Sequence, residues 1–182
     1  MAAITAAAAL RAALAAEDAA IFGYGVAGAH LTGSRQDAAE QDWTAHNEAR
    51  DALTAMISRL GASPVAAQAF YQLPFRVHDA TSAMALAAYL EDGVTRAYLG
   101  LVAVSDQRLR DFGALAMQGP AGRAAYWRGR TQAFPGLQAD ALEDPAAREP
   151  ASDLHAERAP PTGAEPAGPA SCPVPPESLE GS

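Results

Sequence analysis

Four segments of the chain repeat their apolar residues at alternating spacings of four and three, which places those residues along one face of an α-helix. The segments cover residues 5–31, 35–60, 79–104 and 106–117. The face of the first segment carries Leu10, Leu14, Glu17, Ile21, Tyr24, Gly28 and Leu31. No stretch shows the apolar and polar alternation of a half-buried strand. The sequence therefore predicts an all-α fold in which each helix has one face toward the core.

Turn residues group the four segments into two hairpins. Thr32-Gly33-Ser34 separates the first two segments and offers an N-cap to the second. The third and fourth segments meet near residue 105, where Asp106 is expected to open the last helix. Between the hairpins, residues 62–77 contain Pro64 and Pro74 and are interpreted as a long connection. The sequence thus predicts two tight helical hairpins joined by one crossover.

Glycine, proline and capping residues predict where these helices begin and end. Gly61 is a natural terminator of the second helix, and Asp79 or Thr81 is expected to cap the third. Gly119-Pro120 should kink or break the fourth helix, because proline removes a backbone hydrogen bond and clashes one turn back. A final helical turn ending near Trp127 is expected after this point.

The composition of the chain changes after residue 137. Nine of the 13 prolines fall in residues 139–182, where large apolar residues are few. Such a stretch cannot bury enough surface to offset the entropy of ordering it. We therefore predict a folded domain over residues 3–137 and a disordered acidic tail over residues 138–182. Phe134-Pro135-Gly136-Leu137 is expected to fold back as a cover over the helices.

Charge and apolar length argue against nucleic-acid binding and against a membrane-spanning helix. The net charge of the whole chain is −8, and the tail supplies most of it, so the helical part carries no basic stripe and nucleic-acid binding is disfavoured. The longest uncharged stretch, Ala19–Ser34, is shorter than the roughly 20 apolar residues of a membrane helix. The start of the chain lacks the pattern of a targeting segment. We expect a soluble cytoplasmic protein.

Two acidic residues occupy positions that should be apolar. Glu17 lies on the core-facing stripe of the first helix and Glu91 on that of the third. An unpaired buried carboxylate is strongly destabilising, so partners are expected. Reflecting Glu17 through the turn near residue 33 leads to about residue 49, so His46 and Arg50 lie within about one helical turn of its level. The sequence predicts a core cluster of these residues.

A short internal repeat extends the cluster. Glu17 is followed seven residues later by Tyr24, and Glu91 is followed at the same spacing by Tyr98. Each tyrosine therefore lies on the same helical face as its glutamate. Buried tyrosines usually have a hydrogen-bonded hydroxyl, so we expect both to join the polar core.

The chain resembles an actinobacterial ferritin-like family of domains of unknown function over residues 5–137. The resemblance is carried by Leu14-Ala15-Ala16-Glu17-Asp18 with Tyr24-Gly25-Val26, His46 with Arg50-Asp51-Ala52-Leu53, Leu73-Pro74-Phe75, Leu90-Glu91, and Trp127-Arg128 with Phe134-Pro135-Gly136. It implies a ferritin-like four-helix bundle. The hairpin, crossover, hairpin connectivity is also that of ferritin-like bundles.

The resemblance also implies a ligand set against which the sequence can be compared. Ferritin-like di-iron proteins use one Glu from each of two helices and a Glu-x-x-His motif from each of the other two. Glu17 and Glu91 match the single glutamates and His46 matches one histidine, but Trp43 stands in place of a bridging Glu. Reflecting Glu91 through the turn near residue 105 leads to residues 118–120, which offer no ligand. At most three of six ligands remain.

The leading hypothesis is therefore a ferritin-like domain with a degenerate di-metal site, no cofactor, and a structural or interaction role. One alternative is a metal-dependent oxidoreductase that binds iron or manganese through Glu17, His46 and Glu91. Another is a binder of a small amphipathic molecule between the hairpins. Trp43 and Trp127 are expected in the core or covering it. The sequence names no partner and leaves open whether copies of the chain form a homo-oligomer.

Overall fold

The computed structural model of the chain describes residues 4–133. These residues form five α-helices and no strand, which confirms the all-α prediction: α1 Ala6–Gly28, α2 Ser34–Arg59, α3 Ala80–Val102, α4 Gln107–Ala116 and α5 Gln118–Arg128. The chain divides into a unit of residues 1–144 and a unit of residues 145–182, and the described residues all belong to the first. The predicted tail and the predicted cover at Phe134–Leu137 lie outside the described residues.

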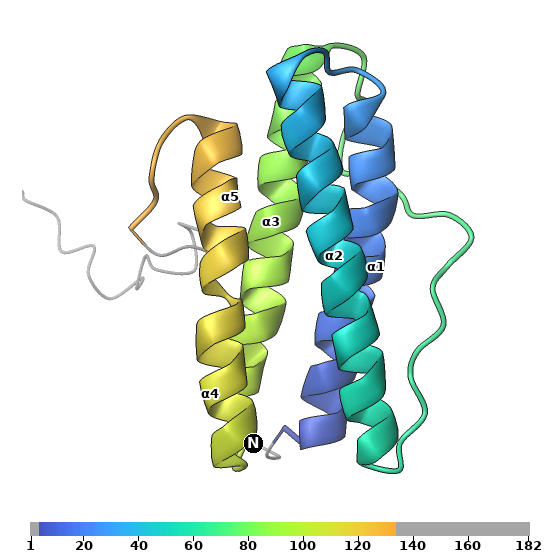
Figure 1. Ribbon diagram of the computed structural model, residues 1–182, viewed down its shortest axis with the longest axis vertical. Helices are drawn as coiled ribbons and strands as arrows, with labels where there is room; N and C mark the ends of the chain where they lie inside the picture. Colours follow the sequence, from blue (N-terminus) through green and yellow to red (C-terminus); the bar gives the residue numbers. More distant parts are fainter. Residues whose placement is uncertain (1–3, 134–182) are drawn as a thin grey trace, which may run out of the picture. The chain divides into compact units, whose positions relative to one another are not determined.

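The helices form two antiparallel hairpins, α1 with α2 and α3 with α4–α5 (Figure 1). The segment between Leu60 and Asp79 runs back along the first hairpin, so α3 runs antiparallel to α1. Close packing joins α1 to both α2 and α3, and joins α3 to both α4 and α5. The pair α1 and α3 therefore forms the centre, with α2 on one side and α4–α5 on the other.

The ends of the helices follow the turn chemistry of the sequence with one exception. Asp79 accepts a hydrogen bond from the backbone N–H of Ser82 and forms a capping box with it, and Asp106 caps α4. Gly61 follows α2 with a φ of +70°, a conformation that favours glycine. The exception is the N-cap of α2, which is Gly33 of the predicted turn, with a φ of +57° and no side-chain hydrogen bond.

The fourth helical segment is broken, but it is longer than the sequence predicted. Met117 separates α4 from α5 at the point where Pro120 cannot donate a hydrogen bond to the carbonyl of Ala116. The prediction of one final turn is wrong, because α5 continues for 11 residues to Arg128. Proline is tolerated in the first turn of a helix, so the chain resumes its helix there. The extension brings Arg123 into the bundle.

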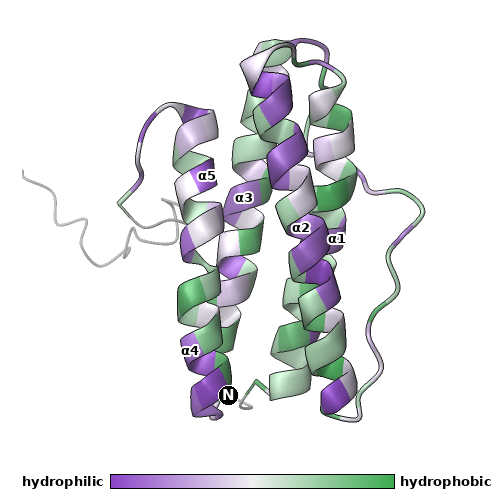
Figure 2. Ribbon diagram, in the orientation of Figure 1, coloured by the Kyte–Doolittle hydropathy of each residue, from purple (hydrophilic) through white to green (hydrophobic). Residues whose placement is uncertain are grey.

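The core lies between the central pair and its two flanks. Its largest fully buried apolar side chains include Leu10 and Leu14 of α1, Leu53 of α2, and Leu86 and Leu101 of α3. Hydrophilic residues run along the face of α2 that is visible in Figure 2, which agrees with α2 packing closely on α1 and only lightly on the other helices. Within residues 4–133, no helix combines the length and the apolar character that crossing a membrane requires.

A glycine allows α4 to approach α3 closely. A Cβ atom at Gly113 would lie 2.7 Å from Cβ of Leu101 and 2.9 Å from the backbone oxygen of Tyr98. We expect Gly113→Ala to lower the free energy of unfolding by about 1–3 kcal/mol, because the overlap outweighs the better helix propensity of alanine. Gly122→Ala on α5 is the matched control, since a Cβ there meets nothing within 4 Å.

Urea unfolding followed by circular dichroism measures both changes. The control should be neutral or more stable by up to about 1 kcal/mol, because alanine is the better helix former. Equal stability of the two variants would contradict the close approach of α3 and α4.

Candidate functional site

Two carboxylates lie in the interior of the bundle, one on each helix of the central pair. Glu17 of α1 is 1 % exposed and Glu91 of α3 is 0 % exposed. Both belong to the core-facing stripes on which the sequence placed them. Because neither reaches water, each carboxylate depends on neighbouring side chains for hydrogen bonds and for compensating charge.

His46 of α2 lies between the two carboxylates. Its Nδ1 is 2.6 Å from Oε2 of Glu17, and its Nε2 is 3.2 Å from Oε1 of Glu91. Burial lowers the pKa of His46, but the hydrogen bonds and charges of the two glutamates outweigh burial and raise that pKa to about 9. At neutral pH both ring nitrogens therefore donate, and His46 is an imidazolium.

The hydroxyl groups of two tyrosines donate hydrogen bonds between the two central helices, α1 and α3. Tyr24 of α1 donates to Oε1 of Glu91 at 2.6 Å, and Tyr98 of α3 donates to Oε1 of Glu17 at 2.7 Å. Because α1 and α3 are antiparallel and share the seven-residue Glu-to-Tyr spacing, the tyrosine of each helix lies level with the glutamate of the other. Burial, together with the adjacent carboxylate, raises the pKa of both tyrosines, so both hydroxyls remain donors.

A second cation comes from α5. Nε of Arg123 donates to Oε1 of Glu91 at 2.7 Å and lies 3.7 Å from a carboxylate oxygen of Asp42. Burial opposes the positive charge of Arg123, but the hydrogen bond and charge of Glu91 outweigh it and raise the pKa of the guanidinium. Burial likewise raises the pKa of Glu91, and His46 and Arg123 together outweigh it and lower that pKa. Glu91 is thus an ionised acceptor.

Arg50 does not take the place that the sequence predicted for it. Its guanidinium donates to Asp51 and Asn47 on its own helix, and its side chain is 36 % exposed. The long arginine side chain reaches water from this position, and His46 already occupies the space beside Glu17. The predicted core position of Arg50 is therefore wrong, and Arg123 supplies the second positive charge instead.

The structure brings together six residues from four helices, which we call the buried ionic cluster. They are Glu17, Tyr24, His46, Glu91, Tyr98 and Arg123. Glu17 and Glu91 face His46 and Arg123, and the carboxylate of Asp42 lies at the edge of the cluster, 3.7 Å from Nε of Arg123 and 3.2 Å from the hydroxyl of Tyr24. Five of these residues were expected in the core from the sequence. Arg123 was missed because Gly119-Pro120 predicted that the helix stops there.

The two tryptophans have opposite surroundings. Trp127 of α5 is 4 % exposed and donates from its indole nitrogen to Asp42 at 2.8 Å, which links α5 to α2. Trp43 is 41 % exposed, so the expectation that it is a core or covering residue is wrong. Gly25 and Gly28 of α1 line the same pocket as Trp43 and contribute no side chain to it.

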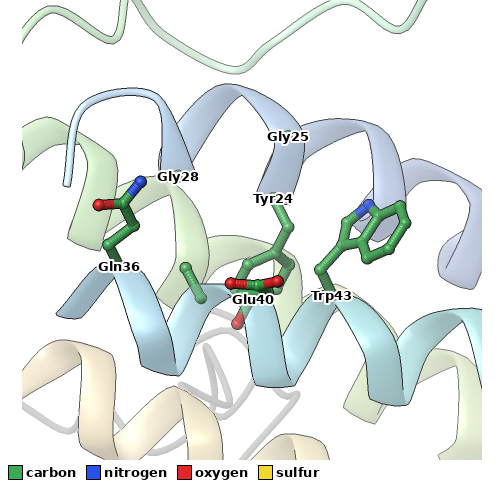
Figure 3. Close-up of a pocket in the computed structure, with 7 residues that line it drawn as sticks. Tyr24, Gly25, Gly28, Gln36, Glu40 and Trp43 are labelled. Atoms are coloured by element: carbon green, nitrogen blue, oxygen red, sulfur yellow. The ribbon is translucent and has the colours of Figure 1, made fainter. Parts of the chain in front are cut away.

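A shallow pocket forms at those glycines. Figure 3 shows Gln36, Glu40 and Trp43 projecting from α2 along its edge. The pocket has a volume of about 210 Å³ and is also lined by Tyr24, the only member of the buried ionic cluster that it reaches. It therefore lies beside the cluster without opening onto the carboxylates.

The buried ionic cluster does not fit a metal ion in this arrangement. Both ring nitrogens of His46 lie within hydrogen-bond distance of a carboxylate, and the raised pKa of His46 favours the protonated form, in which neither nitrogen can coordinate a metal ion. Oε2 of Glu91 is buried without a hydrogen-bond partner among the described residues, but a typical metal site takes at least three protein ligands. Within residues 4–133, no group of three or more His, Cys, Asp or Glu residues has metal-binding geometry.

Comparison with known proteins gives a matching family and similar solved structures. The model of a family described as a domain of unknown function (DUF4439) matches residues 9–139. A crystal structure of a conserved hypothetical protein, Rv2844, from Mycobacterium tuberculosis is 32% identical with a TM-score of 0.65. The match covers 67% of this chain and 93% of that chain. None of the curated proteins matches the chain significantly.

Proposed function

The chain belongs to the DUF4439 family of domains of unknown function, and we propose that it is a ferritin-like bundle in which the buried ionic cluster replaces a di-metal centre. Its role is then structural or binding rather than redox catalysis. The observation that carries this proposal is the position of Arg123, whose Nε lies 2.7 Å from the buried carboxylate of Glu91. A guanidinium there supplies the positive charge that a metal ion would otherwise provide.

The electrostatics of the cluster support the replacement. Two buried carboxylates require nearby positive charge, and ferritin-like di-iron proteins supply it with metal ions. In this chain the protonated side chains of His46 and Arg123 supply that positive charge. A metal ion entering between Glu17 and Glu91 would have to remove a proton from His46 and displace the guanidinium. Both steps oppose binding.

The arrangement of the cluster supports the ferritin-like assignment. In each hairpin the first helix provides a Glu and a Tyr, and the second helix provides a cation: His46 on α2 and Arg123 on α5. Ferritin-like metal centres have the same division, with one Glu from each of two helices and a histidine-bearing motif from each of the others. Arg123 therefore takes the role of the histidine expected from the second hairpin.

Metal loading tests the proposal. We expect the full-length protein, incubated anaerobically with ferrous iron or with manganese and then dialysed, to retain far less than one ion per chain by elemental analysis. Glu17→Ala should retain equally little, while its melting temperature falls because His46 and Tyr98 lose their acceptor.

The alternative, a metal-dependent oxidoreductase that uses Glu17, His46 and Glu91, makes the opposite prediction. Stoichiometric iron or manganese in the unchanged protein, abolished by Glu17→Ala without loss of helicity, would overturn the proposal and support this alternative.

A further inference from the structure

A groove runs between the two flanks of the bundle. It has a volume of about 230 Å³ and separates α2 from α4–α5, which do not pack closely on each other. Ala45, Ala49 and Ala52 line it on α2, and Phe112 and Ala116 line it on α4. We call it the hairpin groove. Its walls are almost wholly apolar, and the small alanine side chains keep it open.

The floor of the hairpin groove is polar. Glu17, Tyr98 and Arg123 of the buried ionic cluster all line it. Arg123 contacts the carboxylates of Glu91 and Asp42 through Nε. Among the described residues, Nη1 and Nη2 have no hydrogen-bond partner, and the side chain is 24 % exposed. A fixed guanidinium thus presents two free donors to the groove.

The polar and apolar ends lie at different levels along the bundle. The guanidinium of Arg123 lies beside Gly119, seven residues beyond Phe112, which at the helical rise corresponds to roughly 10 Å. On the opposite wall, Ala45 is near the level of His46, and Ala52 lies roughly 10 Å further along α2. The groove therefore has a positively charged donor at one end and apolar side chains of α2 and α4 at the other, with Glu17 and Tyr98, whose ring packs on Phe112, on its floor. This arrangement fits a molecule with an anionic head and an aliphatic tail.

We propose that the hairpin groove binds a small monocarboxylate with a short aliphatic chain, whose carboxylate pairs with Nη1 and Nη2 of Arg123. A cavity of about 150 Å³ holds a molecule the size of benzene, so this groove suits a chain of roughly six to ten carbons. Glu17 at the floor disfavours a multiply charged anion such as phosphate, although His46 and Tyr98 compensate its own charge. The inference rests on the proposed function, because Arg123 must serve as the cation of the cluster.

Calorimetric titration with three probes of equal tail length tests the nature of the head group. We expect octanoate to bind the full-length protein with one site per chain, and octanol to bind at least about tenfold more weakly, because it lacks the charge-assisted pair with Arg123. Tighter binding of octylammonium would assign the head group to Glu17 and overturn the proposal. Equal binding of all three probes, or no binding of octanoate, would also overturn it.

A matched pair of variants on α2 tests the location. Ala49→Leu fills the groove and should weaken octanoate binding more than about tenfold. Ala55→Leu makes the same change at an exposed position outside the groove and should leave binding unchanged. Leucine favours helix, and thermal melts verify that both variants fold. Unchanged binding by Ala49→Leu, or a dimer that this change dissociates, would overturn the proposal; the second result would assign the groove to another copy of the chain.

The metal content of the same samples separates the two proposals. If metal-free protein does not bind octanoate, the proposed ligand of the groove is wrong, but the proposed metal-free ionic cluster is not contradicted. Stoichiometric metal in protein that still binds octanoate defeats the proposed function and leaves the groove as a ligand site.

Discussion

Replacing Arg123 by Met should lower the free energy of unfolding by about 2–4 kcal/mol, because it leaves a buried carboxylate without its nearest cation. Glu91 is 0 % exposed and accepts the Nε proton of Arg123 at 2.7 Å. The loss should stay below the largest values for broken buried pairs, since His46 and Tyr24 still donate to the same oxygen. The melting temperature should fall on the order of 10 °C.

Arg50→Met is the matched control for this experiment. It removes the same charge and a similar volume, but the ion pair of Arg50 with Asp51 is largely solvent-exposed and should contribute less than about 1 kcal/mol. Adding Glu91→Gln to Arg123→Met should recover part of the lost stability, because the uncompensated charge disappears. Urea unfolding measures all three effects. Equal losses from Arg50→Met and Arg123→Met would contradict the cluster.

The stability of the protein should fall as the pH rises from about 6.5 through 9. The pKa of His46 is raised from its ordinary value of 6.5 to about 9 in the folded state. A raised pKa means that the folded protein holds the proton more tightly, so the stabilisation is complete below pH 6.5 and is lost as the pH passes the folded value. A shift of this size corresponds to roughly 3 kcal/mol. Unfolding free energies measured across this range test the expectation.

The His46→Gln variant isolates the contribution of the His46 charge to the free energy of unfolding. The variant should be less stable than the unchanged protein near pH 6, and the difference between them should shrink by roughly 3 kcal/mol by pH 9 and above. Glu91 has the opposite sign: its lowered pKa stabilises the fold above its ordinary value of 4.5, and that contribution is lost as the pH falls below it. A difference that does not change with pH would contradict a charged His46.

The sequence predicted the helices and the inward position of Glu17 and Glu91 because the apolar faces of α1 and α3 repeat over many residues. Over more than 20 residues of α1 and of α3, the 3.6-residue period leaves little freedom in which face is buried, so Glu17 and Glu91 could only point inward. The equal Glu-to-Tyr spacing also predicted that Tyr24 and Tyr98 join the core. It did not predict that each tyrosine serves the other helix's glutamate, which follows from the antiparallel packing of α1 on α3.

The choice of the second cation could not be made from the sequence. Reflection through a turn locates a level along the bundle to about one helical turn, and both Arg50 and Arg123 satisfy that tolerance. Applied to Glu91, the reflection leads to residues 118–120, and Arg123 lies one turn further on. Because Gly119-Pro120 predicted a break in the helix, Arg123 was not considered as the second cation. Arginine side chains are also long enough to reach water from a core-facing stripe, as Arg50 does.

The crossed contacts between α1 and α3 have a consequence for how the chain folds. Glu17 of α1 is hydrogen-bonded to Tyr98 of the other hairpin as well as to His46, and Glu91 depends on Tyr24 from the other half of the molecule. A hairpin formed alone would expose a charge that its own residues do not fully satisfy. Native structure in one half is therefore conditional on native structure in the other, and the two hairpins should form a single cooperative unit that appears and disappears together.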